Sequence, residues 1–111
     1  MLLARGEHGD STIVTGCNVE NASFRLTTCA EQSAIATAVG LYGPAIRIRA
    51  VAVANLNGAA SMPCGACRQT ILEFTEFSTS ETWIFYPAEK GASAEAPLKD
   101  LIPAAFRLEQ G

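Results

Sequence analysis

Three cysteines and one glutamate occur in two short segments whose spacing suits metal chemistry. Cys29 and Glu31 stand two residues apart, and Cys64 and Cys67 form a C-x-x-C pair that follows a proline. Three protein ligands and an open fourth position are typical of a catalytic zinc site, where bound water becomes a nucleophile near neutral pH. A bare C-x-x-C pair is equally typical of redox thiols and structural zinc sites. Taken together, the two segments favour a catalytic Zn²⁺ ion held by Cys29, Cys64 and Cys67.

Both segments are predicted to lie at helix starts. Apolar residues recur at helical spacing over residues 29–40, with Gly40 as the expected stop, and a second helix is expected to open at Pro63 and Cys64. Cysteines three residues apart on a first turn lie on one side of the helix, so both can reach one ion. Helix N-termini also stabilise thiolates, the form that a metal requires. Glu31 follows Cys29 by two residues, so its carboxylate can lie close to the metal without coordinating it. Glu31 is therefore predicted to carry protons next to the metal.

The other predicted elements are mainly strands. We expect a hairpin from residues 2–4 and 13–15, strands over 46–54 and 82–86, a loop over 91–97 and a short helix over 98–102. The strand over 46–54 is apolar at odd and even positions, so it is expected to be central with both faces covered. The order β-β-α-β-α-β-α favours a three-layer α/β/α fold. No linker interrupts the sequence, so residues 1–111 are expected to form a single domain.

Composition excludes several classes of protein. The chain has 111 residues, of which 49% are hydrophobic, and a net charge of -3 without any run of Lys or Arg. Nucleic-acid binding is therefore not expected. No apolar stretch approaches the ~18 to 20 residues of a membrane helix, so no membrane association is expected. We expect a cytoplasmic protein with reduced thiols. Cys17 and Trp83 are interpreted as core residues.

The motifs resemble those of a known family, the small homotetrameric cytidine deaminases with a three-cysteine zinc site. The matching segments share the family's order and spacing, and they are GCNVENAS at 16–23, CAE at 29–31, PCGACRQ at 63–69 and LIPAAF at 101–106. The resemblance implies a three-layer fold with a mixed central sheet. It also implies hydrolytic deamination of cytidine and 2′-deoxycytidine to uridine and 2′-deoxyuridine, as in pyrimidine salvage.

The resemblance further implies roles for substrate-binding residues. Asn18 and Glu20 would bind a ribose hydroxyl, the backbone at Ala30 and the Glu31 carboxylate would read the pyrimidine, and Phe106 would pack against the base in a neighbouring subunit. Independently, Asn18 and Glu20 alternate along an extended segment and so face the same way. Without the resemblance, the two would be a turn-forming asparagine and a solvated glutamate.

The sequence departs from the family in three ways that matter. Phe24 stands where tyrosine is frequent after N-A-S, so one hydroxyl near the ribose is missing. Gln32 stands where many three-cysteine members have arginine, so the thiolate charge must be offset by the helix dipoles, by Arg68 or by Arg25. The chain is also expected to begin inside the family's first strand, without the usual N-terminal helix. An apolar sheet face should then be exposed and favour self-association. This face is expected around Ile13, Val51, Val53, Ile84 and Tyr86.

Several alternatives share part of this evidence. Another aminopyrimidine nucleoside, such as a blasticidin-type antibiotic, would use the same catalytic residues. Polynucleotide editing is disfavoured by the acidic balance. A thiol redox protein and an inactive zinc-stabilised module come from different classes. Bound zinc would argue against the first of these, and turnover would exclude the second.

Overall fold

The described part of the chain forms a five-stranded mixed sheet with three helices. The computed structural model describes residues 1–5, 11–23, 26–54, 61–75, 82–89 and 92–103. The elements are β1 (Leu2–Arg5), β2 (Ser11–Ile13), α1 (Ala30–Tyr42), β3 (Ile46–Ala52), α2 (Gly65–Glu73), β4 (Trp83–Pro87), β5 (Ser93–Pro97) and α3 (Leu98–Leu101). The strand order is β2-β1-β3-β4-β5, and only the β3–β4 pair is parallel. The predicted α/β class with a mixed sheet is confirmed, and so is the pairing of the first two strands.

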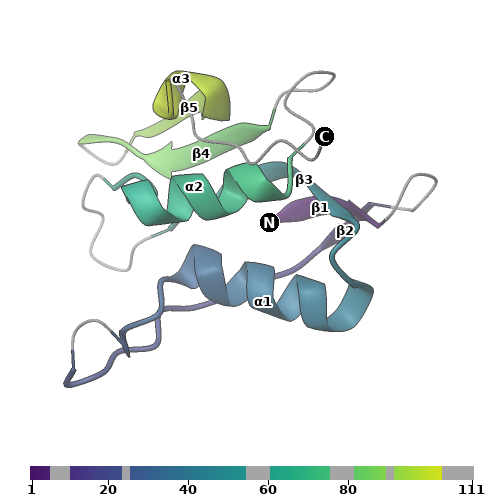
Figure 1. The fold of residues 1–111 in the computed structure, drawn as a ribbon. Coiled ribbons are helices and arrows are strands. Elements are labelled where there is room, and N and C mark those ends of the chain that lie inside the picture. The colour runs from purple at the N-terminus through teal and green to yellow at the C-terminus, as the bar shows by residue number, and fades with distance from the viewer. Residues whose placement is uncertain (6–10, 24–25, 55–60, 76–81, 90–91, 104–111) are drawn as a thin grey trace.

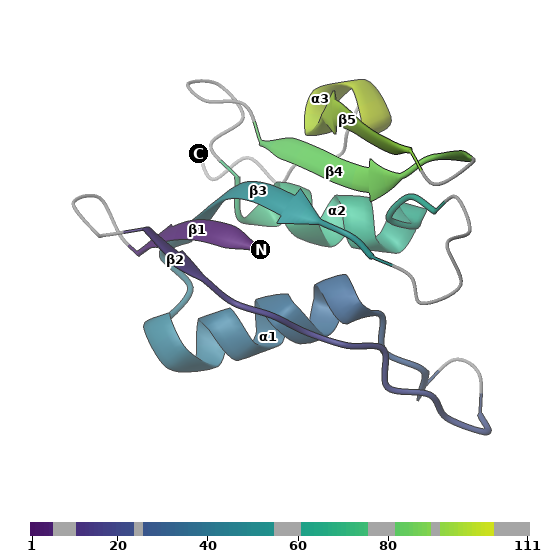
Figure 2. The ribbon, with the colours of Figure 1, turned by 180° about the vertical axis from the view of Figure 1, so that it is seen from behind.

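Helices α1 and α2 lie side by side on one face of the sheet (Figures 1 and 2). Both helices and the sheet contribute to one core. Its buried members are Ile35, Ile48, Val51, Ile71, Leu72, Ile84 and Leu98. The last of these begins α3, which follows β5 directly and packs against α2. Among the described residues no helix is both long and apolar enough to cross a membrane.

A bulge in β3 decides which of its residues enter this core. Leu3 pairs with Ile48 while Leu2 pairs with Ala50, so Arg49 is the extra residue on β3. The extra residue shifts the alternation, and Ile48 and Val51 therefore both face the helices. The expectation that both faces of this strand are covered is wrong for the described part of the chain. The bulge explains why large core residues occur at both even and odd positions of the strand.

The opposite face of the sheet carries an apolar row. The strand registers align Ile13, Leu2, Ala50, Trp83 and Pro97 across the sheet. Ile13 is 72% exposed and Trp83 is 37% exposed. Phe85, two residues after Trp83 on β4, is 39% exposed. Trp83 is therefore not a core residue. The predicted exposed face is present and includes Ile13 as expected, but its other residues differ from those expected.

Val51 and Ile84, which were expected on the exposed face, belong to the buried core instead. Val53 and Tyr86 are partly buried and pack against the same core. The bulge in β3 reverses the expected assignment on that strand. On β4, Ile84 and its neighbour Phe85 face opposite ways because side chains alternate along a strand.

Two element boundaries also differ from expectation. Residues 93–97 were expected in a loop but form β5, which pairs antiparallel with β4 at every position of both strands. Their sequence has low strand propensity, so the pairing itself stabilises this edge strand. Helix α1 passes through Gly40 and ends at Tyr42. Gly43 caps it with φ 85° and donates its N–H to the Val39 carbonyl.

The two glycines at this helix end should respond oppositely to alanine. A Cβ at Gly40 would meet nothing within 4 Å, so Gly40→Ala should raise the free energy of unfolding by roughly 1 kcal/mol. Gly43→Ala should lower it by about 1–3 kcal/mol, because φ of 85° is strained for any residue with a Cβ. Urea unfolding of both variants checks the pair. A loss of stability in Gly40→Ala would mean that the helix does end there.

Candidate metal centre and active site

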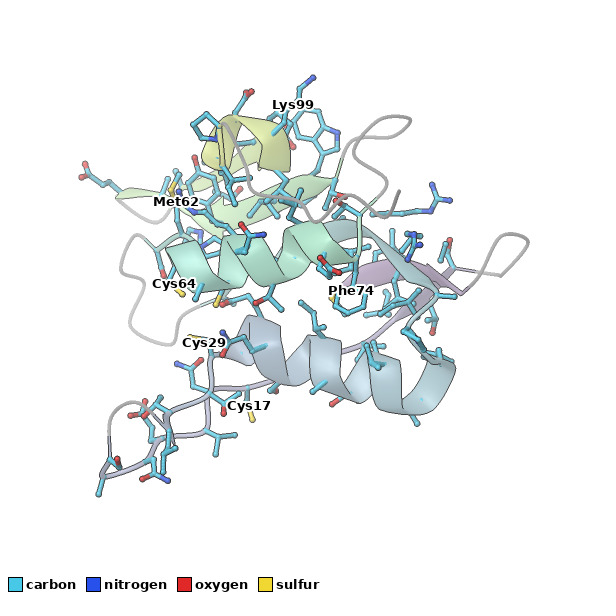
Figure 3. All side chains as sticks on the ribbon, viewed as in Figure 1. Cys17, Cys29, Met62, Cys64, Phe74 and Lys99 are labelled. Carbon is cyan, nitrogen blue, oxygen red and sulfur yellow. The ribbon has the colours of Figure 1, made fainter. Side chains whose placement is uncertain are left out.

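Three cysteine sulfurs meet where the N-terminal ends of α1 and α2 face each other. The Sγ atoms of Cys29, Cys64 and Cys67 all lie within 4.8 Å of one another, and those of Cys64 and Cys67 are 3.2 Å apart (Figure 3). Zinc binds thiolates at about 2.3 Å, so ligand sulfurs around one tetrahedral ion lie roughly 3.8 Å apart. The cluster therefore fits a zinc ion with modest adjustment. The third cysteine also distinguishes it from a two-cysteine redox pair.

The two helix caps present these sulfurs differently. Cys64 is the N-cap of α2, and its sulfur accepts a hydrogen bond from the Cys67 N–H at 3.4 Å. Cys29 is the N-cap of α1, but its side chain makes no capping bond. The Ala30 N–H is instead donated to Asn18 Oδ1 at 2.7 Å. Asn18 thus serves as a cap from outside the helix, and the Cys29 sulfur stays free to face the other two thiols.

The three thiols have different pKa values. The Cys67 N–H bonded to the Cys64 sulfur lowers the pKa of Cys64, and this outweighs the effect of burial. Burial, together with hydrogen bonds to Glu31 and the other two thiols, raises the pKa of Cys67. For Cys29 a hydrogen bond with Cys67 acts to lower the pKa, but burial and repulsion from Cys64 raise it overall. Of the three, Cys64 therefore ionises first.

Glu31 lies beside the cluster on the first turn of α1. Its carboxylate contributes to the raised pKa of the Cys67 thiol, and its negative charge acts to raise the pKa of Cys29 as well. The side chain is half-buried. A carboxylate in this position can exchange protons with a molecule bound beside the thiols.

An open cleft of about 570 Å³ adjoins the cluster. Its walls include Asn18, Cys29, Ala30, Glu31, Met62 and Cys64. Glu31 also borders a second hollow of about 200 Å³, so it lies between the two spaces. Small-molecule sites typically measure ~300–1,000 Å³, and the cleft falls in that range.

Val53 and Ala54 line both spaces and were not predicted as site residues. They directly follow β3, and ligands in open α/β sheets bind beyond the carboxyl ends of strands. That rule would have pointed to them.

The segment before α1 is bonded onto its first turn. A Cβ on Gly16 would lie 2.5 Å from both Ala30 O and Ala34 N, so only glycine permits this approach. The Cys17 N–H is donated to Ser33 Oγ at 3.2 Å. Gly16 is a further residue that sequence analysis did not single out, although it opens the GCN motif. Together with Asn18, these contacts hold the turn that carries Glu31.

Other predicted site residues have mixed outcomes. Asn18 borders the cleft, whereas Glu20 is exposed and is not among the residues that border it. Cys17 is exposed rather than buried, because it lies in the segment outside α1 and not at a strand end. Phe106 and Arg25 lie outside the described residues.

Comparisons with known proteins agree with the geometry. The family model described as "Cytidine and deoxycytidylate deaminase zinc-binding region" matches residues 6–80. A cytidine deaminase of Mycobacterium tuberculosis (strain CDC 1551 / Oshkosh) is 42% identical over 100 residues, covering 90% of this chain and 68% of the relative. One from Sporosarcina psychrophila is 40% identical over 100 residues, covering 90% and 70%.

Solved structures give the same result. The crystal structure of cytidine deaminase from Mycobacterium tuberculosis matches with TM-score 0.67 and 35% identity, covering 96% of this chain and 77% of that one. The cytidine deaminase from Burkholderia pseudomallei matches with TM-score 0.67 and 29% identity, covering 95% and 78%.

Thiol alkylation should follow the order of the pKa values. In zinc-free Cys17→Ser protein at neutral pH, iodoacetamide should modify Cys64 first, because its pKa is lowered and its side chain exposed. Cys67 should react last, and only at higher pH, because its pKa is raised and it is buried. Peptide mass spectrometry against time and pH measures the order, and added zinc should protect all three thiols. Faster modification of Cys67 than of Cys64 would contradict the described surroundings.

Proposed function

The chain belongs to the cytidine deaminase family of zinc-dependent hydrolases, and we propose that it converts cytidine and water to uridine and ammonia. The observation that carries this proposal is the Glu31 carboxylate beside three convergent cysteine sulfurs at the edge of an open cleft. 2′-Deoxycytidine is proposed as a second substrate, giving 2′-deoxyuridine. Such a reaction serves pyrimidine salvage.

Cys29, Cys64 and Cys67 are the proposed zinc ligands. Their number and mutual distances suit a site with one position open to solvent or substrate. When bound, zinc supplies Lewis acidity and lowers the pKa of water to about 7. The N-terminal ends of α1 and α2 favour the thiolate forms that this requires.

Glu31 is the proposed proton carrier. Its carboxylate accepts a proton from the water that attacks C4 of the base and transfers it to ring nitrogen N3. It then takes the second proton of that water and gives it to the departing amine, which leaves as ammonia. The position of Glu31 in the wall of the cleft, beside the three cysteines, supports this role.

Substrate binding is proposed for Asn18, Glu20, Ala30 and Phe106. Asn18 Oδ1 accepts the Ala30 N–H, which leaves the Asn18 amide nitrogen to donate to a ribose hydroxyl. The base is then proposed to bind the Ala30 carbonyl, or to bind the Ala30 N–H by replacing Asn18 Oδ1 as its acceptor. Phe106 is proposed to act in a neighbouring subunit's site.

The proposed assembly is a homotetramer of single-domain chains in the cytoplasm. The exposed row that includes Ile13 and Trp83 supports self-association, since exposed apolar patches favour burial against a partner. Free cysteines also suit a reducing compartment.

Turnover of cytidine tests the function and the role of Glu31 together. The unsubstituted zinc protein should form uridine, measured by the change in ultraviolet absorbance. Glu31→Gln should keep its zinc and fold but lose at least ~100- to 10,000-fold in kcat, the usual contribution of general acid/base catalysis. Glu73→Gln, the same change at an exposed position of α2, should leave kcat unchanged. Near-normal turnover in Glu31→Gln would mean that a group other than Glu31 carries the protons.

Subunit mixing tests the shared site. Glu31→Gln and Phe106→Ala chains should each be poorly active alone, but their mixture should regain activity. The reason is that a mixed tetramer contains sites with an intact Glu31 from one chain and an intact Phe106 from another. Sedimentation at micromolar concentration should give a tetramer. A fully active monomer, or no recovery on mixing although mixed tetramers form, would contradict the shared site.

A further inference from the structure

Arg68 links the metal-binding turn to the last helix. Its Nε donates to the Pro63 carbonyl at 2.8 Å, its Nη1 to the Leu101 carbonyl at 2.8 Å, and its Nη2 approaches Met62 Sδ at 3.5 Å. The side chain is half-buried. Each of these three partners is uncharged, so the contacts use the direction of the guanidinium N–H groups and not an opposite charge.

The three partners occupy positions that matter for the sulfur cluster. Met62 and Pro63 immediately precede Cys64, the N-cap of α2 whose sulfur faces Cys29 (Figure 3). Leu101 is the last residue of α3 and lies 33 positions away in sequence. One side chain thus holds the turn before a proposed zinc ligand against a distant part of the fold.

We propose that Arg68 is a positioning residue for the metal centre. Its bond to Pro63 fixes the direction in which the chain enters Cys64, and its bond to Leu101 anchors that turn to the end of α3. The orientation of the Cys64 sulfur relative to Cys29 and Cys67 then depends on the guanidinium group. This inference rests on the proposed role of Cys64 as a zinc ligand.

A charge-based role is the competing explanation, because a nearby cation would offset the charge of three thiolates. The two roles make different demands on the side chain. Positioning requires a planar fork that reaches two carbonyls at once, which lysine cannot provide. Charge compensation requires only a cation, which lysine retains. Arg68→Lys therefore separates the two roles, and Arg68→Met removes both while keeping an apolar stem.

The experiment measures zinc release to a chromophoric chelator and the absorption spectrum of the cobalt-substituted protein. Both Arg68→Lys and Arg68→Met should release zinc about 10- to 100-fold more readily, as is typical when a group that orients a metal ligand is lost. Both should also shift the cobalt bands, which report ligand geometry. Arg47→Lys is the matched control, since Arg47 is another half-buried arginine bonded to a backbone carbonyl, at 2.7 Å. It should behave as the unsubstituted protein.

Two results would overturn the proposal. If Arg68→Lys matches the unsubstituted protein while Arg68→Met loses zinc, charge is the function of Arg68. If both variants unfold more easily but keep the same zinc release and cobalt spectrum, Arg68 only stabilises the fold. Arg68→Gln replaces the methionine variant if that variant does not fold. Because neither readout requires turnover, a failure of the unsubstituted protein to deaminate cytidine would count against the proposed function alone.

Discussion

The arrangement of the site depends on the approach of three cysteine sulfurs to within 4.8 Å of one another, which becomes unfavourable when the thiols ionise. Close thiolates repel, and burial of Cys67 raises its pKa further. Two features work against this cost before any metal binds. Both cysteine groups lie at helix N-termini, where the backbone dipoles favour negative charge, and the Cys67 N–H stabilises the Cys64 sulfur. Zinc adds the remaining compensation by holding all three sulfurs as thiolates.

The core sets the positions of these helix ends. Ile35 of α1 and Ile71 of α2 pack together with Val51 of β3, so the two helices are held against a common strand. Outside the core, Asn18 caps α1 and Gly16 allows its segment to lie directly on the first turn. The two helices are thus capped in different ways, since the Cys64 sulfur caps α2 itself, whereas the cap of α1 comes from Asn18 in a separate segment.

The site was more predictable from the sequence than the sheet was. Spacing within a helix turn determines which side chains lie together, so Cys64 and Cys67 could be paired from sequence, and Glu31 could be put near them. The bulge at Arg49 depends on pairing between β1 and β3, which are distant in sequence, and the local pattern of β3 does not encode it. The edge strand β5 depends on its pairing with β4, because its own residues have low strand propensity. The predicted helix end at Gly40 was wrong for a related reason. Glycine weakens a helix but ends it only where the backbone requires a positive φ, as at Gly43.

The bulge at Arg49 also has a consequence for assembly. By turning Ile48 and Val51 to the same side, it concentrates the large apolar residues of β3 beneath α1 and α2 and leaves only arginines and small alanines of this strand away from the core. The other face nevertheless carries Ile13 and Trp83 from the flanking strands, at 72% and 37% exposure. The sheet thus has one face that builds the catalytic geometry and another whose apolar side chains lack cover within the described residues. Covering that face would stabilise the sheet without touching the sulfur cluster, since Val51 reaches the helices from the opposite side of the same strand.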